Sequence, residues 1–505
     1  MVSLVYSAAI LGIEASVVEV EVYISNGMPR FSIVGLADIA IKESRDRIFA
    51  AIKNSGFNFP FKRITVNLAP ANTKKEGGAF DLPIALGILA SMGKVDQERL
   101  KSFCAVGELA LDGKIRRING ALPIALGIKK DLKDIIVPFG NRQEAAVIKD
   151  INVYPFNTLN EVVDFINGMQ CEPFIYDPDK DNTDYFDFEN DFEDIKGQFT
   201  ARRAAEIAAA GSHNMIMSGP PGAGKTMIAK RIPGILPFMS FDESIETTKI
   251  WSAAGKSFSG GLIRIRPFRS PHHTTSPVAL AGGGTYPKPG EVSLASNGIL
   301  FLDEFAEFRR DSLEILRQPL EDKCITISRA KIVLTFPASF MLVAAMNPCP
   351  CGNLGNTQKE CICNEHQVQK YRNRISGPLL DRIDIHIDVP ALKTSELTSM
   401  NEKSESSQSI RKRVIEARNI QTERFKGLKI YANGQMGVKD IKVHCISDDK
   451  AKQILKSAID KLNLSARAYD RVLKVSRTIA DLDKSEIIKG VHAAEAVHYR
   501  LIDRN

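Results

Sequence analysis

Hydrophobic and polar residues alternate along the chain with two different periods. Near the N-terminus, residues 18–24 alternate valine and isoleucine with glutamate and tyrosine, the period of two that a half-buried strand produces. Further strand-like runs cover 64–68 and 105–111, and helical spacing covers 39–53 and 81–90. These elements predict an α+β domain over residues 1–168.

The pattern changes twice further along. Apolar runs and helical stretches alternate over residues 195–390, which predicts an α/β domain with a parallel sheet and crossover helices. Helical spacing then dominates residues 391–505 and predicts a third, α-helical domain. Residues 169–194, rich in Asp and Asn, are expected to form an exposed linker, and the Ser-, Glu- and Lys-rich stretch 394–408 a mobile connection.

Length and composition fit this multidomain α/β plan. The chain has 505 residues, of which 44% are hydrophobic, enough for several independent cores. Its sequence contains no run of about 18 apolar residues, the length that a membrane helix needs. The first twenty residues contain Glu14 and Glu19 and lack the Lys or Arg residues with which a secretory signal begins. We therefore expect a cytoplasmic protein with no membrane contact.

Charge is unevenly distributed along the chain. Residues 172–194 contain ten acidic residues and one lysine, a local charge of −9, whereas the whole chain carries +7. Residues 391–505 contain 23 basic and 15 acidic residues. This basic excess suits a polyanionic partner, and it is equally compatible with ordinary solubility.

Residues 219–226, GPPGAGKT, fit the phosphate-binding pattern G-x-x-x-x-G-K-[ST]. They follow the apolar run 215–217 and precede a helical stretch, which is the context that this loop requires. Backbone N–H groups of such a loop surround phosphate oxygens, Lys225 neutralises the β and γ charges, and the Thr226 hydroxyl binds Mg²⁺. The predicted ATP contacts are Gly219, Pro220, Pro221, Gly222, Ala223, Gly224, Lys225 and Thr226.

The second half of an ATPase site is predicted where the apolar run 298–302 ends in two acids. Asp303 is placed to hold Mg²⁺, and Glu304 to orient and deprotonate the attacking water. A further strand over 340–346 ends in Asn347, whose amide is suited to bind the γ-phosphate or that water. Together with the phosphate loop, these residues predict Mg²⁺-dependent ATP hydrolysis.

Four of the eight cysteines lie in one segment with the spacing C-x-C-x9-C-x-C. Four thiolates in so short a loop match a tetrahedral Zn²⁺ site, although C-x-C is tighter than the commoner C-x2-C. The alternative is redox-active or unligated thiols. The predicted zinc ligands are Cys349, Cys351, Cys361 and Cys363.

Together the motifs resemble the AAA+ ATPases, most closely the ComM/YifB family of bacterial proteins related to the magnesium-chelatase motor subunit. The resemblance covers essentially the whole chain and rests on GQ at 197, GPPGAGKT, RPFRSPHHT from 266, GILFLDEF from 298, AAMNPCPCG from 344 and GPLLDRID from 377. It implies that Asn347 is the sensor-1 residue. It also implies that Arg382 is an arginine finger for the neighbouring subunit's ATP, and that Arg467, ahead of Arg471, is the sensor-2 residue.

An arginine finger that acts in trans requires assembly, so the resemblance implies a homo-oligomeric ring, expected to have six subunits. In that ring the zinc loop is expected to pin the segment between Asn347 and Arg382. The C-terminal helices are then a lid domain of the magnesium-chelatase type.

Two inserts are candidates for contact with DNA. Residues 325–334 predict a β-hairpin with a basic tip, similar to the pre-sensor-1 hairpin of MCM helicases; the alternative is a solvated tip. The loop 264–284 combines arginines with three glycines. Its His272 and His273 have three alternative roles: metal ligands, phosphate contacts or packed side chains. The candidate contacts are Arg329, Lys331, Arg264, Arg266 and Arg269.

The N-terminal domain resembles the proteolytic domain of the Lon family over 66–89 and 106–118. The alignment places Ala79 at the serine nucleophile and Leu122 at its lysine base. Neither side chain can perform that chemistry, so we expect an inactive domain that serves assembly or substrate engagement.

The resemblance implies an ATP-driven motor on single-stranded or branched DNA, which performs branch migration during homologous recombination of transforming DNA. One alternative is a magnesium-chelatase-type motor that drives metal insertion into a porphyrin. Another is an ATP-switched scaffold without DNA translocation. The expected cofactors are ATP, Mg²⁺ and Zn²⁺.

Overall fold

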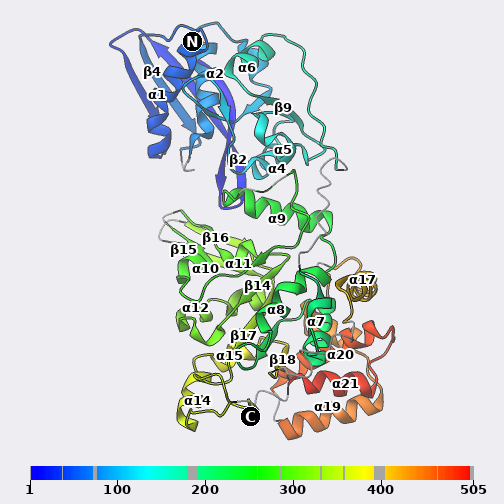
Figure 1. Cartoon of the computed structure of the whole chain (residues 1–505). Helices are drawn as coiled ribbons and strands as arrows, with labels where there is room; N and C mark the ends of the chain where they lie inside the picture. The colour runs from blue at the N-terminus through cyan, green and yellow to red at the C-terminus, as the bar shows by residue number, and fades with distance from the viewer. Residues whose placement is uncertain are drawn as a thin grey trace. The chain divides into compact units, whose positions relative to one another are not determined.

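Figure 1 shows a computed structural model of the chain. It describes residues 2–36, 38–71, 75, 77–178, 190–256, 258, 260–284, 286–329, 332–356, 359–391, 404–428, 430–462 and 465–500. Two compact units are present. Unit 1 comprises Met1–Thr183 and Phe241–Ile263, and unit 2 comprises Asp184–Ser240 and Arg264–Asn505.

Unit 1 is built on a seven-stranded mixed sheet with the order β3-β4-β2-β1-β5-β8-β9. β1, β2 and β4 pair antiparallel, whereas the other neighbours pair parallel. Val18, Val20 and Val22 on β2 are fully buried, so the alternating pattern is confirmed as a strand with one buried face. The strands are β1 Val2–Leu11, β2 Glu14–Ser25, β3 Arg30–Val34, β4 Arg63–Ala69, β5 Phe103–Ala105, β8 Asp134–Pro138 and β9 Asn152–Phe156.

The two predicted helices of unit 1 are confirmed as α1, Ile39–Asn54, and α2, Asp81–Ser91. The single strand expected over 105–111 is wrong. The chain leaves the sheet after Ala105 because the Gly107 N–H donates to the Ala79 carbonyl, and the Gly107 carbonyl accepts from Leu82. The remaining elements are η1 Gly78–Phe80, α3 Gln97–Leu100, β6 Glu108–Leu109, β7 Ile115–Arg116, α4 Ala121–Ile128, η2 Phe139–Asn141, α5 Arg142–Ala146 and α6 Leu159–Ile166.

Helix α9, Phe241–Ala253, belongs to unit 1 although it lies between two elements of unit 2 in the sequence. It packs against α4 (Figure 1). Its Ser252 hydroxyl donates to the buried Glu144 carboxylate, and Lys249 pairs with Glu14 at 2.5 Å. The sequence pattern placed this segment in the ATPase domain, whereas its contacts are with the N-terminal unit.

Unit 2 contains a five-stranded, all-parallel sheet with the order β11-β14-β17-β10-β18. This confirms the α/β prediction. β14 and β17 are buried along their whole length, as expected for strands covered on both faces. The carboxyl ends of all five strands meet at one edge. The strands are β10 Met215–Ser218, β11 Phe268–Arg269, β14 Ile299–Leu302, β17 Met341–Met346 and β18 Ile385–Asp388.

Helices surround this sheet, and those after residue 404 share its hydrophobic core. The helical elements of unit 2 before residue 404 are α7 Phe199–Gly211, α8 Lys225–Arg231, η4 Ile232–Ile235, α10 Pro277–Ala281, α11 Glu291–Leu294, η5 Phe305–Glu307, α12 Arg310–Glu314, α13 Arg317–Asp322, α14 Glu365–Arg372 and α15 Gly377–Leu380. The later elements are α17 Ser407–Arg424, η6 Asn433–Gln435, α18 Val438–His444, α19 Asp449–Leu462, α20 Ala466–Leu482 and α21 Gly490–His498.

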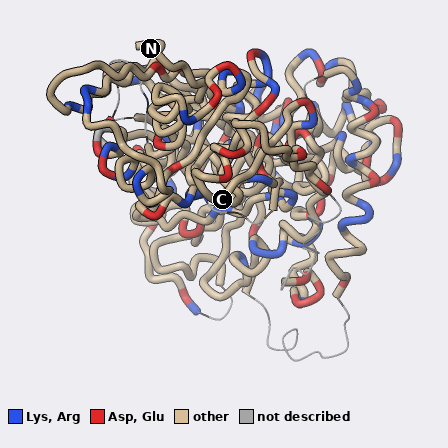
Figure 2. The backbone as a smooth tube through the Cα atoms, turned by 90° about the horizontal axis from the view of Figure 1, so that it is seen from above, with Lys and Arg blue, Asp and Glu red and all other residues tan. Residues whose placement is uncertain are grey.

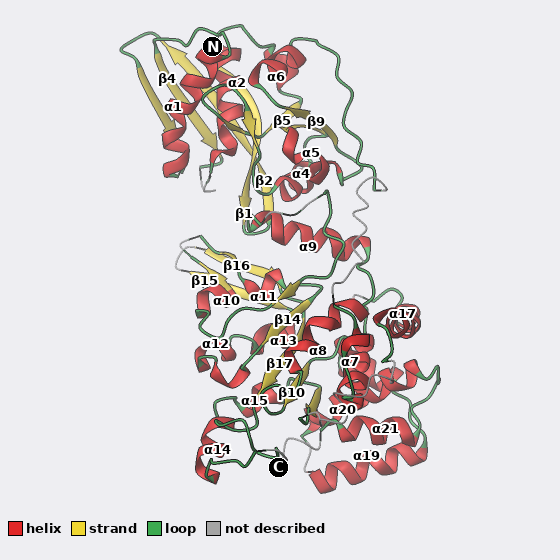
Figure 3. Ribbon diagram, viewed as in Figure 1, coloured by secondary structure: helices red, strands yellow, loops and turns green. Residues whose placement is uncertain are grey.

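The predicted hairpin is present as β15, Cys324–Arg329, and β16, Ile332–Pro337. The strands pair antiparallel, with Arg329 opposite Ile332, and form a separate ribbon (Figure 3). Lys331, expected at the tip, lies outside the described residues. A smaller ribbon joins β12, Gly282–Gly283, to β13, Lys288–Pro289.

The expectation of an exposed linker is wrong at its C-terminal end. Phe192 is fully buried in the core of unit 2 and opens the turn η3, Phe192–Asp194. Residues 179–189, and 394–403 of the expected mobile connection, lie outside the described residues. In the part of the chain that is described, none of the helices has the length and apolar character needed to cross a membrane.

Candidate active site

The phosphate-loop lysine is a buried cation at the centre of the sheet edge. β10 leads into the loop, and Gly224, with a φ of +91°, turns the chain into α8. Lys225 Nζ donates to the carbonyls of Gly219 at 2.5 Å and Pro220 at 2.9 Å, and to Asn347 Oδ1 at 3.3 Å. Burial lowers the pKa of Lys225, because the charged form is poorly solvated there. Anionic phosphate oxygens would stabilise this charge better than the neutral oxygens that surround it.

Thr226 and Asp303 meet across the edge from two neighbouring segments. Asp303 directly follows β14, and the Thr226 hydroxyl donates to Asp303 Oδ2 at 2.7 Å. A hydroxyl and a carboxylate oxygen are hard ligands of the kind that Mg²⁺ prefers. The two residues therefore fit a shared Mg²⁺ site beside Lys225.

Glu304 is held in an unusual backbone conformation next to this pair. Its φ of +51° lies in the left-handed region, which is uncommon for a residue other than glycine and is often found at functional sites. The Glu304 N–H donates to Asp303 Oδ1 at 2.9 Å, and the side chain is 57% exposed. The carboxylate thus reaches solvent at the sheet edge.

Sequence reasoning missed one partner of Glu304. His273 Nδ1 lies 2.9 Å from Glu304 Oε2. His273 follows β11, which pairs parallel with β14, so the two loops that leave these strands are neighbours. The adjacent histidines after a short strand were visible in the sequence, but their partner depends on which strand lies beside β11.

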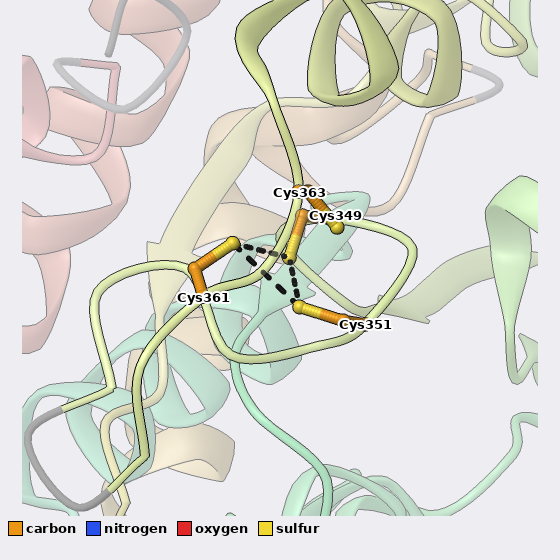
Figure 4. Close-up of side chains that lie close together, drawn as sticks. All are labelled: Cys349, Cys351, Cys361 and Cys363. Carbon is orange, nitrogen blue, oxygen red and sulfur yellow. Dashed lines mark hydrogen bonds between the residues drawn. The ribbon is translucent and has the colours of Figure 1, made fainter.

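The cysteine loop begins two residues after Asn347 and brings its sulfurs together (Figure 4). Sγ–Sγ distances among Cys349, Cys351 and Cys361 are 3.5, 3.6 and 3.6 Å, and all four ligand atoms lie within 4.8 Å of one another. A tetrahedral site with Zn–S bonds of about 2.3 Å places its sulfurs roughly 3.8 Å apart. The sulfur–sulfur geometry therefore fits Zn²⁺.

This loop also contacts the phosphate loop. Gly352 has a φ of +77°, and a Cβ at this position would lie 2.7 Å from Pro221 Cδ. Only glycine permits so close an approach in this conformation. The sulfur cluster is therefore positioned to support both the phosphate loop and Asn347.

The residues assigned to subunit communication are engaged within the chain. Arg382 is buried, with 6% of its surface exposed, and donates to Glu321 Oε2 and the Pro378 carbonyl, both at 2.5 Å. Arg467 is 67% exposed and lies 3.9 Å from the same Glu321. Arg471 pairs with the buried Asp384 at 2.5 Å, so it joins α20 to the start of β18.

The candidate DNA contacts divide into two groups. Arg266 donates to the carbonyls of Pro237, Phe238 and Asn297, and Arg269 makes a two-pronged pair with Glu291 at 2.6 and 2.8 Å. These contacts favour structural roles. Arg264 and Arg329 are exposed. Basic and acidic residues are interspersed along the described backbone (Figure 2), so single exposed arginines, and not overall charge, identify the candidate contacts.

In unit 1 the two positions aligned with a protease site lie in one apolar cluster. Leu122 is fully buried in it, and Ala79 packs against it. The Leu122 N–H donates to Glu144 Oε1 at 3.1 Å. Both aligned positions therefore make hydrophobic contacts with this cluster.

Comparison with known proteins gives matches along almost the whole chain. Residues 191–397 match the family model of magnesium chelatase, subunit ChlI. Residues 20–141 match that of subunit ChlI of Mg-chelatase, and residues 404–500 that of the subunit ChlI C-terminal region.

Relatives match over a similar span. Competence protein ComM of Haemophilus influenzae is 46% identical over 504 residues, which cover 99% of this chain and 98% of that protein. Uncharacterized protein YifB of Escherichia coli is 42% identical over 503 residues, 99% of this chain and 97% of the relative. DNA replication licensing factor mcm7 of Schizosaccharomyces pombe is 27% identical over 205 residues, 40% of this chain and 23% of its own length.

Proposed function

The chain belongs to the ComM/YifB family of proteins related to the magnesium-chelatase subunit ChlI, and on that premise we propose that it is a ring-shaped ATP-driven motor on DNA. This AAA+ family implies ATP hydrolysis. One observation carries the catalytic part of the proposal: Lys225, Asn347, and the Thr226–Asp303 pair converge at the edge from which Glu304 projects.

In the proposed reaction, water attacks the γ-phosphorus while the bond to the bridging β–γ oxygen breaks, which yields ADP and phosphate. Glu304 accepts the proton of the attacking water. Lys225 stabilises negative charge on the phosphates, and Asn347 orients the γ-phosphate or the water. Thr226 and Asp303 would hold Mg²⁺, which would supply positive charge beside the phosphates.

The DNA part of the proposal rests on the hairpin and on the relatives. Arg329 is exposed at the end of β15, beside the tip of the ribbon, and such a cation binds phosphates without reading bases. Relatives include a competence protein and a DNA replication licensing factor. We propose branch migration of recombining DNA, single-stranded or branched, with Lys331 and Arg264 as further contacts.

Assembly is the third part of the proposal. We propose a homo-oligomeric ring of six in which Arg382 leaves Glu321 and the Pro378 carbonyl to reach the neighbour's ATP, while Arg467 senses the ATP of its own subunit. In this proposal residues 1–168, with helix α9 packed on them, are an inactive Lon-like domain, the rest of 195–390 is the ATPase core and 391–505 is the lid. Both arginines lie against Glu321 in this structure. In the proposal, Glu321 is therefore their shared partner when neither arginine contacts ATP.

The first experiment compares ATPase rates without DNA, with single-stranded DNA and with branched DNA. The expected result is stimulation of the wild type and loss of that stimulation in Arg329→Ala, with an unchanged basal rate. Arg309→Ala is the matched control, because Arg309 is 69% exposed and pairs only locally with Asp311 in the described contacts. Indifference of the wild type to every DNA form would contradict the motor proposal.

The same assay separates the alternatives. A chelatase-type motor would ignore DNA and respond to a partner that inserts magnesium into a porphyrin. A scaffold switched by ATP would bind nucleotide without releasing phosphate. Arg329 is exposed on a hairpin, and one relative is a competence protein. These two observations favour the DNA motor over the chelatase-type motor and the scaffold.

Zn²⁺ is the cofactor proposed for the cysteine loop, with a structural role. Cys349→Ser should lose bound zinc and raise the KM for ATP, because the loop supports Pro221 and Asn347. Cys171→Ser is the control, since Cys171 is exposed and lies in unit 1. Zinc content and ATPase kinetics are measured on the same preparation. A zinc-free Cys349→Ser protein with full DNA-stimulated activity would refute the structural role.

A further inference from the structure

We propose that unit 1 carries a second contact for single-stranded DNA on an open face of its sheet. In this contact, bases stack on Tyr23 and Phe61, and phosphates bind Arg30 and Arg63. The inference rests on the proposed function, because it takes DNA as the partner. It adds a site that lies outside the ATPase unit and its hairpin.

The two faces of the unit 1 sheet are covered differently. Val20 and Val22 on β2 belong to the core that α1 and α2 share. Val17, which points the other way, packs on the apolar cluster of α4. Beyond it, the residues of β2 on that side, from Glu19 to Ser25, are half-buried or exposed. The end of this face near Ser25 is therefore open to solvent.

The register of three strands brings the proposed contacts together on the open face. Arg63, the first residue of β4, is the partner of Ser25 on β2 and of Arg30 on β3. Tyr23 is the partner of Thr65, two residues further along β4, so it is a diagonal neighbour of Arg63 at about 7–8 Å. The Tyr23 side chain is 47% exposed. An exposed aromatic ring thus lies beside two arginines.

Arg30 and Arg63 are two cations on neighbouring strands, which lie about 4.8 Å apart. The hydrogen bond between the Ser32 and Thr65 hydroxyls shows that paired residues of β3 and β4 point to the same face. Both arginines and Lys62 are exposed, and none of the three pairs with a carboxylate in the part of the chain that the structure describes. Like charges in this position repel each other. A bound phosphate would relieve that repulsion.

The acids on the same face lie toward its other end. Glu21 accepts a hydrogen bond from Asn67 at 2.8 Å, and Glu19 is opposite Ala69. A strand rises about 3.3 Å per residue, so the two acids lie roughly 13 and 20 Å from the level of Arg63 along the sheet. The end of the face that carries the arginines therefore complements a polyanion.

Phe61 adds a second aromatic ring at the rim of this face. Phe59 packs against the core of unit 1 and lies 5.0 Å from the Phe49 ring, whereas Phe61, two residues on, is 78% exposed. The loop 26–29 joins β2 to β3, the strands on either side of β4, so it crosses the end of β4 where Phe61 leads into the strand. This loop carries Met28, which is 90% exposed.

Exposed aromatic rings beside cations favour single-stranded over double-stranded DNA. Unpaired bases offer their faces for stacking, whereas in a duplex neighbouring base pairs cover those faces. Proteins that bind single strands without sequence preference combine stacking rings with cations that follow the backbone. An apolar protein segment could cover Phe61 and Met28, but it would leave the charges of Arg30 and Arg63 unbalanced. The charge therefore favours the nucleic acid.

The test measures equilibrium binding of the full chain to fluorescent oligo(dT) in the absence of nucleotide. Tyr23→Ala should weaken binding about 5-fold or more, the effect of losing one stacked base. Tyr23→Phe should bind as the wild type does, because the ring is kept. An abasic oligonucleotide of the same length should bind Tyr23→Ala and the wild type equally.

The double variant Arg30→Ala/Arg63→Ala tests the phosphate contacts. It should weaken binding of both oligonucleotides, and it should reduce the slope of log K against log salt by about 1.4, at about 0.7 per phosphate contact. Arg45→Ala is the matched control, because Arg45 is exposed on α1, which packs on the covered face of the sheet. Circular dichroism and thermal unfolding confirm that each variant is folded. Light-induced cross-linking of oligo(dT) that carries iododeoxyuridine should label Tyr23 or Phe61.

Wild-type affinity for oligo(dT) in both Tyr23→Ala and the double arginine variant would overturn the proposal. Equal losses of affinity for oligo(dT) and for the abasic strand in Tyr23→Ala would also overturn it, as would a wild type that binds no oligo(dT). Loss of binding in Arg329→Ala alone would leave the motor proposal standing and remove this site. Loss of binding in the unit 1 variants, together with an ATPase rate that ignores DNA, would support this site and remove the motor.

Discussion

One buried ionisable group in each unit, Asp81 in unit 1 and Lys225 in unit 2, has a different kind of partner. In unit 1 the aligned protease positions are Ala79 and Leu122, and the buried Asp81 is held by Arg47 at 2.7 Å. In unit 2 the buried Lys225 donates to neutral oxygens beside Glu304, which is 57% exposed. Asp81 is thus paired with an opposite charge, whereas the hydrogen-bond partners of Lys225 are neutral oxygens, which phosphate oxygens could replace.

The largest effect should come from removing the base in unit 2. Glu304→Gln should lower kcat about 10²- to 10⁴-fold, the contribution of a general base, while ATP binding is retained. Lys225→Ala should instead abolish ATP binding. Phosphate release and equilibrium nucleotide binding measure the two effects separately.

Glu307→Gln is the control for the first substitution, because Glu307 lies one turn further on and pairs with Arg374 at 2.6 Å. It should keep the wild-type kcat. Equal loss in both glutamine variants would point to disruption of the turn and would remove Glu304 from the proposed role.

The corresponding change in unit 1 should destabilise the protein without producing peptidase activity. Leu122→Lys places an ammonium in a fully buried apolar cluster, at a cost of about 3–5 kcal/mol. Leu111→Lys, at a position 58% exposed, should be close to neutral. Urea unfolding, followed with a probe in unit 1, measures the free energy of unfolding of the two variants. Peptide cleavage by a folded Ala79→Ser/Leu122→Lys protein would break the comparison.

The smallest expected effects are opposite pH dependences of the two units. Burial raises the pKa of Asp81 to about 6 despite Arg47, so the folded unit binds this proton more tightly than the unfolded chain. The Asp81 contribution to stability therefore falls as the pH rises from about 4 to about 6. Burial alone would also raise the pKa of Asp384, but Arg471 and His213 hold it well below its usual range. The Asp384 contribution is present above about pH 4 and is lost as the pH falls.

Hydrogen exchange in α2 and β18, corrected for its intrinsic pH dependence, measures these two slopes. Asp81→Asn should flatten the first slope, by at most about 3 kcal/mol over the window, and Asp384→Asn should flatten the second. Slopes of the same sign in both units would show that the two carboxyl groups are not in the environments described.

The sequence was sufficient wherever the chemistry is local. The phosphate loop, the acids after β14 and the hairpin follow from contiguous residues whose backbone geometry their own composition dictates. Arg266 and Arg269, predicted as DNA contacts, have carbonyl and Glu291 partners within the chain that are distant in the sequence and that the sequence pattern does not reveal. The His273 contact and the burial of Phe192 likewise depend on which segments the fold makes neighbours. Alternation of apolar residues does not encode those neighbours.

The most direct test of the central claim follows three-stranded and four-stranded DNA junctions with ATP, in the wild type and in Glu304→Gln. We predict ATP-dependent movement of the junction by the wild type. Glu304→Gln should bind the same junctions without moving them, and Glu307→Gln should behave as the wild type. Movement at equal rates with Glu304→Gln, or a wild type that hydrolyses ATP and moves none of these junctions, would contradict the account.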